Sequence, residues 1–298
     1  WRGPLFIGGA QLGRYRQEVK MDGMTSNEAY RTLTVTRCSP HIGAEIGNID
    51  LTSPLNDLEQ AELKRAFTEN LVLFFRDQKI SFDDHARLGE YFGSLGQHAG
   101  KKTHSEKLED PRVRRFHFDE NSNGEISGHA WHTDQSCAPI PPLGSILYLH
   151  TIPPNGGGDT IFVSLYAAYD ALSDRMKDYL EGLSALHDGV RIFGDGTPRT
   201  EHPIVIRHPE SGRKALYMSS SAVRWLNGVP KGEGKGVAKF LKEHCRSPEF
   251  YFRFRWEPHS IAFWDNRCCN HRPINDYLPD VRSGYRVQIE GHAPPVAG

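Results

Sequence analysis

The stretch Trp131-His132-Thr133-Asp134-Gln135-Ser136 is followed at once by a proline-rich run at 138–142. Residues i and i+2 of an extended segment project to the same side, so His132 and Asp134 can reach one ion without a special turn. A further histidine, His271, stands far downstream. Two imidazoles and one carboxylate form the ligand set of non-haem iron(II) centres, which leaves the other coordination positions open. We therefore predict that His132, Asp134 and His271 bind one iron(II) ion.

The H-x-D pattern alone has little specificity. The chain has 15 histidines in 298 residues, so chance gives roughly one such pattern. Two H-x-D patterns occur, and two more fit the looser form H-x-[DE]: His132/Asp134, His117/Asp119, His104/Glu106 and His208/Glu210. A solvated histidine beside an acid is the simpler interpretation of each. His117 stands in a polar run without a comparable downstream partner, so the context favours the pair at 132 and 134.

Two arginines, Arg282 and Arg286, follow His271. A guanidinium matches a carboxylate with two parallel hydrogen bonds and stays charged when it is desolvated. Arg282 is therefore predicted to anchor the far carboxylate of a 2-oxoglutarate molecule that chelates the metal. Arg286 returns to the same face of a strand by the period of two. A second buried cation there needs a counter-charge, which predicts an anionic substrate at Arg286.

Four motifs in this order resemble the taurine dioxygenase (TauD/TfdA) family of iron(II)/2-oxoglutarate-dependent dioxygenases. The resemblance extends from about residue 33 to residue 292. The matching segments are Trp131-His132-Thr133-Asp134, Gly156-Gly157-Gly158-Asp159-Thr160, Phe263-Trp264-Asp265-Asn266-Arg267 with His271, and Arg282-x-x-x-Arg286 closing on Gly291.

The resemblance implies the reaction and two further residues. Fe(II), 2-oxoglutarate and O2 would be used to hydroxylate the substrate, with succinate and CO2 as coproducts and collapse of the product where the attacked carbon bears a leaving group. Thr160 would add a hydrogen bond to the 2-oxoglutarate, and His98 would help to hold the substrate anion.

Taurine-specific members carry an asparagine shortly before H-x-D, where this chain has Ser-Gly-His-Ala at 127–130. Taurine is therefore not the expected substrate, and other sulfonates, sulfate esters, aryloxyalkanoates and small carboxylates remain open.

The rest of the sequence predicts many short strands. Apolar alternation or short apolar runs indicate strands at 33–36, 42–51, 71–75, 113–118, 146–149, 250–256, 261–266 and 286–291, and a hairpin at 204–206 and 215–217. Many short strands with a few helices outside predict a mostly β (α+β) fold. Its expected form is a cupin-like double-stranded β-helix, or jelly roll, whose mouth holds the ligand.

Apolar residues at helical spacing predict four helices. They are expected at 55–71, from Ser81 to about residue 92, at 165–183 and around 237–245. Leu58 and Phe240 are expected on the buried faces of the first and the last of these. The polar segment 99–128, apart from its one strand, is expected to form a loop beside the metal and is a candidate lid.

Length and composition set broader bounds. We expect an irregular arm at 1–30, which could be a surface extension or a homo-oligomer contact, followed by a single domain at 31–298. A net charge of −1 gives no footprint for nucleic acid, and no apolar run has the length of a membrane span. Five cysteines without a C-x-x-C pair, and without a recognisable secretory leader, favour a reduced, cytoplasmic protein. Cys268 and Cys269 are predicted to pack in the core and not to bind zinc.

Other function classes have less support. A non-catalytic or regulatory binding module could keep the same fold, but a complete ligand set with a cosubstrate anchor counts against it. An oxygenase that acts on a protein or a nucleic acid would need a basic or extended docking surface, which the composition does not offer. The sequence favours a dioxygenase for a small anionic organic substrate.

Overall fold

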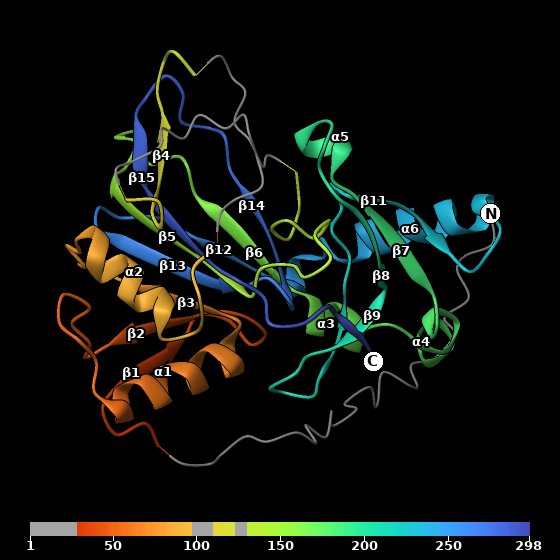
Figure 1. Cartoon of the computed structure of the whole chain (residues 1–298), viewed down its shortest axis with the longest axis horizontal. Helices are drawn as coiled ribbons and strands as arrows, with labels where there is room; N and C mark the ends of the chain where they lie inside the picture. The colour runs from red at the N-terminus through yellow and green to blue at the C-terminus, as the bar shows by residue number, and fades with distance from the viewer. Residues whose placement is uncertain (1–28, 97–109, 123–129) are drawn as a thin grey trace, which may run out of the picture.

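The computed structural model describes residues 29–96, 110–122 and 130–298, and its largest element is a sheet of seven strands (Figure 1). Neighbouring strands in this sheet are antiparallel, except that β2 and β3 are parallel. In spatial order the strands are β1 (Thr34–Arg37), β2 (Ala44–Gly47), β3 (Val72–Phe75), β13 (Ser260–Asp265), β5 (Gly144–Thr151), β15 (Arg282–Ile289) and β4 (Arg114–Phe118).

A second sheet faces the inner side of the first. Its order is β12 (Tyr251–Phe254), β6 (Thr160–Ser164) and β14 (Cys269–Pro273), all antiparallel. Phe74 of β3 stacks on Phe254 of β12 with ring centroids 4.0 Å apart, and Phe162 of β6 lies 5.7 Å from the ring of Trp264 of β13. These contacts close the sheets over one apolar core. The predicted jelly roll is therefore confirmed.

Two helices cover the outer side of the seven-stranded sheet (Figure 1). They are α1 (Asp57–Asn70), capped by Asn56, and α2 (Phe82–Glu90), capped by Ser81 as predicted. Phe67 of α1 stacks on Phe263 of β13 at 4.0 Å between ring centroids. Because side chains alternate along a strand, Phe263 faces these helices while its neighbour Trp264 faces the inner core.

Smaller elements complete the fold on the side away from α1 and α2. One three-stranded sheet has the order β11 (Val223–Asn227), β7 (Ser184–Asp188), β8 (Arg199–Pro203). Another has the order β10 (Lys214–Leu216), β9 (Val205–Arg207), β16 (Val296–Ala297), which confirms the predicted hairpin. The helices here are α3 (Leu165–Asp170), α4 (Asp174–Leu180), α5 (Val190–Phe193), α6 (Lys231–His244) and the 3-10 turn η1 (Pro248–Phe250).

Three local predictions were wrong. The helix expected at 165–183 is two helices, because the Ser173 side chain caps a new helix by accepting the Met176 N–H. Leu58 is 43% exposed, since it lies in the first turn of α1 and the deeper turns supply the buried face. Phe240 is 45% exposed and lies against His244 on the outer side of α6.

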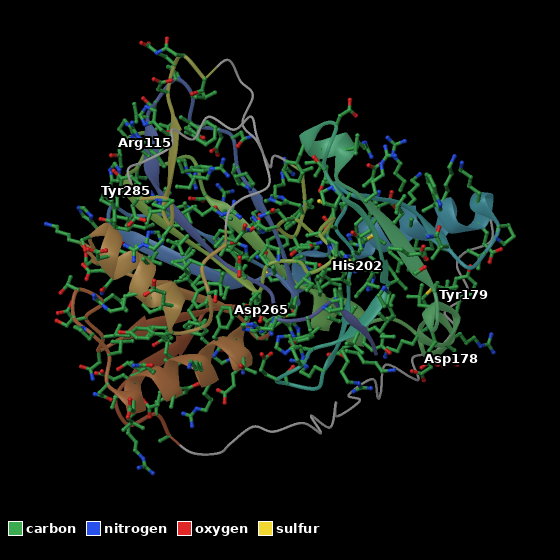
Figure 2. The ribbon with its side chains drawn as sticks, viewed as in Figure 1. Arg115, Asp178, Tyr179, His202, Asp265 and Tyr285 are labelled. Carbon is green, nitrogen blue, oxygen red and sulfur yellow. The ribbon has the colours of Figure 1, made fainter. Side chains whose placement is uncertain are left out.

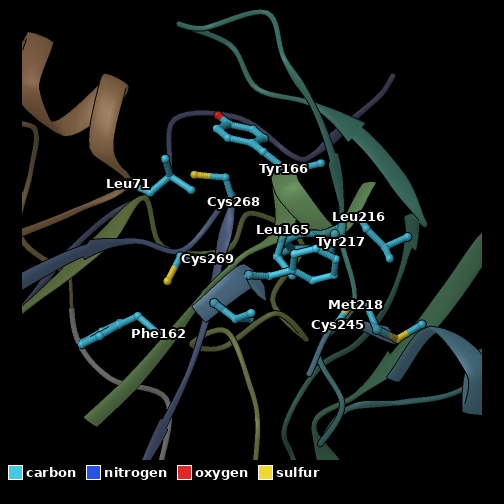
Figure 3. Close-up of a cluster of buried hydrophobic side chains, with 14 of the residues drawn as sticks. Leu71, Phe162, Leu165, Tyr166, Leu216, Tyr217, Met218, Cys245, Cys268 and Cys269 are labelled. Atoms are coloured by element: carbon cyan, nitrogen blue, oxygen red, sulfur yellow. The ribbon is translucent and has the colours of Figure 1, made fainter. Parts of the chain in front are cut away.

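The prediction that Cys268 and Cys269 pack in the core is confirmed. All five are free thiols, and Cys268 and Cys269 are buried in the core between the sheets. Figure 3 shows their side chains pointing to opposite sides, with Cys268 directed towards Leu71 and Tyr166. Burial raises the pKa of both thiols, which favours packing over metal binding. Among the described helices, none has the length and apolar character of a membrane span.

Candidate active site

His132 and His271 are brought together by the main chain. His271 lies on β14, and the loop at 132 pairs with it through an isolated antiparallel bridge. The His132 N–H donates to the His271 carbonyl at 3.1 Å, and the His271 N–H donates to the His132 carbonyl at 2.8 Å. Their rings lie 4.2 Å apart between centroids. The backbone therefore sets the spacing of the two imidazoles.

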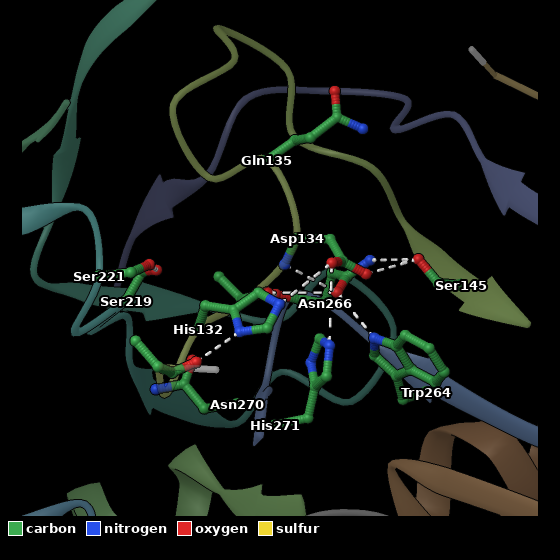
Figure 4. Close-up of polar contacts among 12 residues, drawn as sticks. His132, Asp134, Gln135, Ser145, Ser219, Ser221, Trp264, Asn266, Asn270 and His271 are labelled. Carbon is green, nitrogen blue, oxygen red and sulfur yellow. Dashed lines mark hydrogen bonds and ion pairs between the residues drawn. The ribbon is translucent and has the colours of Figure 1, made fainter. Parts of the chain in front are cut away.

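Asp134 completes a triangle of donor atoms (Figure 4). Its Oδ1 lies 3.6 Å from Nε2 of His132 and 3.8 Å from Nε2 of His271. The three ligand atoms lie within 4.8 Å of one another, with two imidazole nitrogens and one carboxylate oxygen around a common point. This is the facial arrangement that one divalent metal ion accepts. The structure thus brings together the three predicted residues.

The other carboxylate oxygen of Asp134 is already bonded. Ser145 on β5 donates its hydroxyl hydrogen to Oδ2 at 2.7 Å, and Nη2 of Arg286 on β15 lies 2.5 Å from the same oxygen. Burial raises the pKa of Asp134, but the nearby charge of Arg286 outweighs it and holds that pKa well below its ordinary value. Asp134 is therefore ionised, and its Oδ1 faces the imidazoles.

His132 is held in the tautomer that can ligate through Nε2, and His271 is neutral. Nδ1 of His132 lies 2.7 Å from the Ala130 carbonyl oxygen. A carbonyl only accepts, so Nδ1 carries the hydrogen and Nε2 presents its lone pair. Burial, followed by the nearby His132, holds the pKa of His271 well below its ordinary value, so this ring is neutral.

Asn266 holds the loop that carries Asp134. Its side-chain oxygen accepts from the Asp134 main-chain N–H at 3.2 Å and from Nε1 of Trp264 at 3.1 Å, while its carbonyl accepts from the Thr133 hydroxyl at 2.6 Å. Its amide nitrogen donates to Ser145 at 3.3 Å. We made no prediction for Asn266 or Ser145. Asn266 belongs to the motif at 263–267, but its sequence context indicated no role for it. No sequence pattern pointed to Ser145.

Arg282 is a buried cation without a carboxylate partner among the described residues. It is 2% exposed, Nε donates to the Gly158 carbonyl at 3.0 Å, and Nη2 has no hydrogen-bond partner. The rings of Phe116 and Trp256 each lie 5.6 Å from its guanidinium carbon. Burial lowers the pKa of Arg282 to about 10, so the side chain stays charged at neutral pH. Such a buried charge calls for an anion.

Thr160 lies beside this cation. Its hydroxyl oxygen accepts a hydrogen bond from Nε1 of Trp256 at 3.0 Å, and the Trp256 ring in turn flanks the Arg282 guanidinium. The indole uses an acceptor lone pair of Thr160, so the hydroxyl hydrogen remains free to be donated. Thr160 and Arg282, the two residues predicted to bind 2-oxoglutarate, thus both lie beside Trp256.

The competing pair His117 and Asp119 lies elsewhere. Nε2 of His117 is 3.7 Å from the Asp119 carboxylate, and its Nδ1 lies 3.0 Å from the hydroxyl oxygen of Ser283. Both side chains are partly exposed, and no third ligand joins them in the described part of the chain. The predicted substrate residue His98, like His104 and most of the candidate lid at 99–128, lies outside the described residues.

A second buried group, formed by His208, Asp265 and Cys268, also has metal-ligand residue types. Arg267 donates to both oxygens of Asp265, with Nε at 2.9 Å from Oδ1 and Nη2 at 2.7 Å from Oδ2. Nε2 of His208 lies 3.0 Å from Oδ2, and its Nδ1 accepts from the Ser211 N–H at 3.2 Å. A fixed cation already neutralises this carboxylate, so the group is a satisfied hydrogen-bond network and not a metal site.

Fold and site together define a class of protein, a double-stranded β-helix with a His-Asp-His cluster between its two sheets. Residues 34–288 match the family described as taurine catabolism dioxygenase TauD, TfdA family, and the chain belongs to that family.

Individual relatives agree with this assignment. An alpha-ketoglutarate-dependent 2,4-dichlorophenoxyacetate dioxygenase of Cupriavidus pinatubonensis is 32% identical over 78% of this chain and 89% of that protein. A solved taurine dioxygenase from Burkholderia xenovorans is 33% identical, with a TM-score of 0.79 over 90% of this chain and 96% of its own. The structure of AAD-2 with Mn(II) and N-oxalylglycine is 26% identical, with a TM-score of 0.80 over 89% and 100%.

Proposed function

We propose that this protein is an Fe(II)- and 2-oxoglutarate-dependent dioxygenase that hydroxylates a small anionic organic substrate. The observation that carries the proposal is the combination of three converging donor atoms at His132, Asp134 and His271 with a buried, unpaired cation at Arg282. A binding module would need neither a ligand set with open positions nor an anchor for a second anion. The catalytic interpretation therefore has the stronger support.

The donor set fits iron(II). Asp134 would ligate through Oδ1, because Ser145 and Arg286 occupy Oδ2, and both histidines would ligate through Nε2. Three protein ligands on one face leave room for a cosubstrate and O2. When bound, the metal and 2-oxoglutarate would supply the oxidant, with succinate and CO2 as coproducts.

Arg282 and Thr160 are the proposed anchor for the distal carboxylate of 2-oxoglutarate. A carboxylate beside Arg282 would give Nη2 the partner that it lacks in the described structure and would offset its buried charge. The surrounding aromatic rings exclude water from this ion pair, which makes it stronger than an exposed pair. Arg282 and Thr160 thus orient the cosubstrate.

Arg286 is the proposed contact for the substrate anion. Nη2 lies against Asp134 and 3.1 Å from Ser145, whereas the buried Nε has no partner among the described residues. Once Asp134 shares its charge with a metal ion, Arg286 can attract another anion. A sulfonate, a sulfate ester or an aryloxy acid would fit this requirement, and the product would collapse where the hydroxylated carbon bears a leaving group. His98 is proposed as a second contact to this anion.

We also propose that residues 31–298 act as one dioxygenase domain. The support is that β1 and β15, near the two ends of this range, belong to the same sheet. Five cysteines without a disulfide support a reducing, cytoplasmic location.

Anaerobic addition of Fe(II) and 2-oxoglutarate tests the reaction class. We expect the weak visible charge-transfer band of a metal-bound keto acid. Metal binding without this band would favour the binding-module alternative. Succinate release with a panel of sulfonates, sulfate esters and aryloxy acids then identifies the substrate class.

Two arginine variants separate the proposed roles. Arg282→Ala should steeply raise the concentration of 2-oxoglutarate that the enzyme requires. Arg286→Ala should impair the coupling of succinate release to the substrate more than it impairs 2-oxoglutarate binding. Arg207→Ala, which removes an exposed arginine from β9, is the matched control. Equal effects of the two site variants on both measurements would contradict this division.

A further inference from the structure

Tyr277 carries a second unpartnered polar group beside Arg282. The residue is 1% exposed, and its hydroxyl has no hydrogen-bond partner in the described structure. The guanidinium carbon of Arg282 lies 5.9 Å from the centroid of the Tyr277 ring. A buried hydroxyl without a partner costs about 1–3 kcal/mol. Two such groups side by side indicate a missing acceptor.

The surrounding loops are built to bring Tyr277 and Arg282 together. Gly158, in the glycine-rich turn before β6, donates its N–H to the side chain of Asp276 at 2.8 Å and accepts from Nε of Arg282 at 3.0 Å. A Cβ at Gly158 would lie 2.9 Å from Cδ of Arg282 and 3.3 Å from Cδ1 of Tyr277. The turn at 155–158 and the loop at 276–277 are thus hydrogen-bonded around a close three-way contact that only glycine allows.

We propose that the Tyr277 hydroxyl donates a hydrogen bond to the distal carboxylate of 2-oxoglutarate, next to Arg282 and Thr160. This inference rests on the proposed function. A guanidinium has no acceptor atom, so Arg282 cannot accept from the Tyr277 hydroxyl. A carboxylate accepts several hydrogen bonds at once and would satisfy both groups.

Tyr277→Phe removes the hydroxyl and keeps the ring. Binding of 2-oxoglutarate to the Fe(II)-loaded protein, titrated without oxygen, should weaken about tenfold, the effect of one hydrogen bond to a charged group. The melting temperature without cosubstrate should stay the same or rise, because the variant loses a buried unpaired hydroxyl.

Tyr285→Phe is the matched control. Tyr285 lies on β15 opposite Arg115 of β4 (Figure 2), and its ring packs against Phe82 of α2, on the helix-covered side of the sheet. This variant should bind 2-oxoglutarate as the unchanged protein does.

A monocarboxylic cosubstrate analogue locates the contact. 2-Oxovalerate keeps the keto acid and lacks the distal carboxylate, so Tyr277→Phe should bind it as well as the unchanged protein does. An equal loss for both keto acids, or no loss for 2-oxoglutarate, would overturn the role of Tyr277 while leaving the proposed function intact. Failure of the unchanged Fe(II) protein to bind 2-oxoglutarate would instead overturn the proposed function.

Discussion

His132 and His271 hydrogen-bond to each other through their main chains in both directions, at 3.1 and 2.8 Å. These bonds do not depend on the imidazole rings or on a metal ion. The ligand triangle is therefore formed by the fold, and Ser145 and Arg286 bond the non-ligating oxygen of Asp134. A preformed site of this kind binds its ion without first having to fold.

Metal removal should leave the protein folded. The two sheets close over a core of apolar side chains, and the three ligand residues are not part of that core. We expect unchanged far-UV circular dichroism after chelation, and a melting temperature that rises with Fe(II) or Mn(II) concentration by mass action. Loss of secondary structure on chelation would show that the metal is structural.

Ser145→Ala should weaken metal binding by about tenfold or more, the range found when a partner of a ligand is removed. Ser145 donates to Oδ2 of Asp134 and accepts from Asn266 and Arg286, so its loss frees the carboxylate to rotate. Calorimetric titration with Mn(II) measures the change. Ser283→Ala removes an equally buried hydroxyl that bonds to His117, and this control should bind metal normally. Equal affinities for all three proteins would contradict the role of Ser145.

The triad was predictable because local rules govern it. The period of two places His132 and Asp134 on one side of the chain, and the spacing of the motifs supplied His271. Ser145 depends on strand register instead. It stands opposite Trp264 in the pairing of β5 with β13, which brings its hydroxyl under Asp134. No pattern in a single sequence fixes the pairing of strands so far apart.

The apolar pattern of the sequence also did not predict which side chains of two helices are exposed. Leu58 lies four residues before the buried Glu62, and Phe240 lies three residues after the partly buried Val237, yet both side chains are exposed. The break between α3 and α4 had a visible signal, since Ser173-Asp174 is a typical N-cap sequence. Apolar periodicity across the break outweighed that signal in the prediction.

Acid should weaken the attachment of the first strand through Glu62. This carboxylate accepts main-chain N–H groups of Arg31, Thr32 and Leu33 and the Thr32 hydroxyl. Burial raises the pKa of Glu62, but these hydrogen bonds outweigh it and lower that pKa from 4.5 to about 2. A lowered pKa means that the stabilisation is complete above pH 4.5 and is lost as the pH falls towards 2.

Glu62→Gln tests this dependence. The variant should melt several degrees lower at pH 7, as expected for a loss of about 1–2 kcal/mol, and the gap to the unchanged protein should narrow between pH 4.5 and pH 3. Thermal melts at each pH measure it, with the exposed Glu249→Gln as control. A gap that stays constant with pH would exclude the ionised carboxylate as the cause.

Gly158→Ala should impair cosubstrate binding more than stability alone explains. Gly158 has φ +82°, and an added Cβ would lie 2.9 Å from Cδ and 3.0 Å from Nε of Arg282. The methyl group would displace the guanidinium, so we expect a 2-oxoglutarate dissociation constant raised by about tenfold or more. Gly212→Ala is the matched control, because Gly212 has φ +67° with no atom near its Cβ position. It carries similar backbone strain, so both variants should lose stability while only Gly158→Ala loses affinity. If both variants lost the same affinity for 2-oxoglutarate, the cause would be backbone strain and not displacement of Arg282.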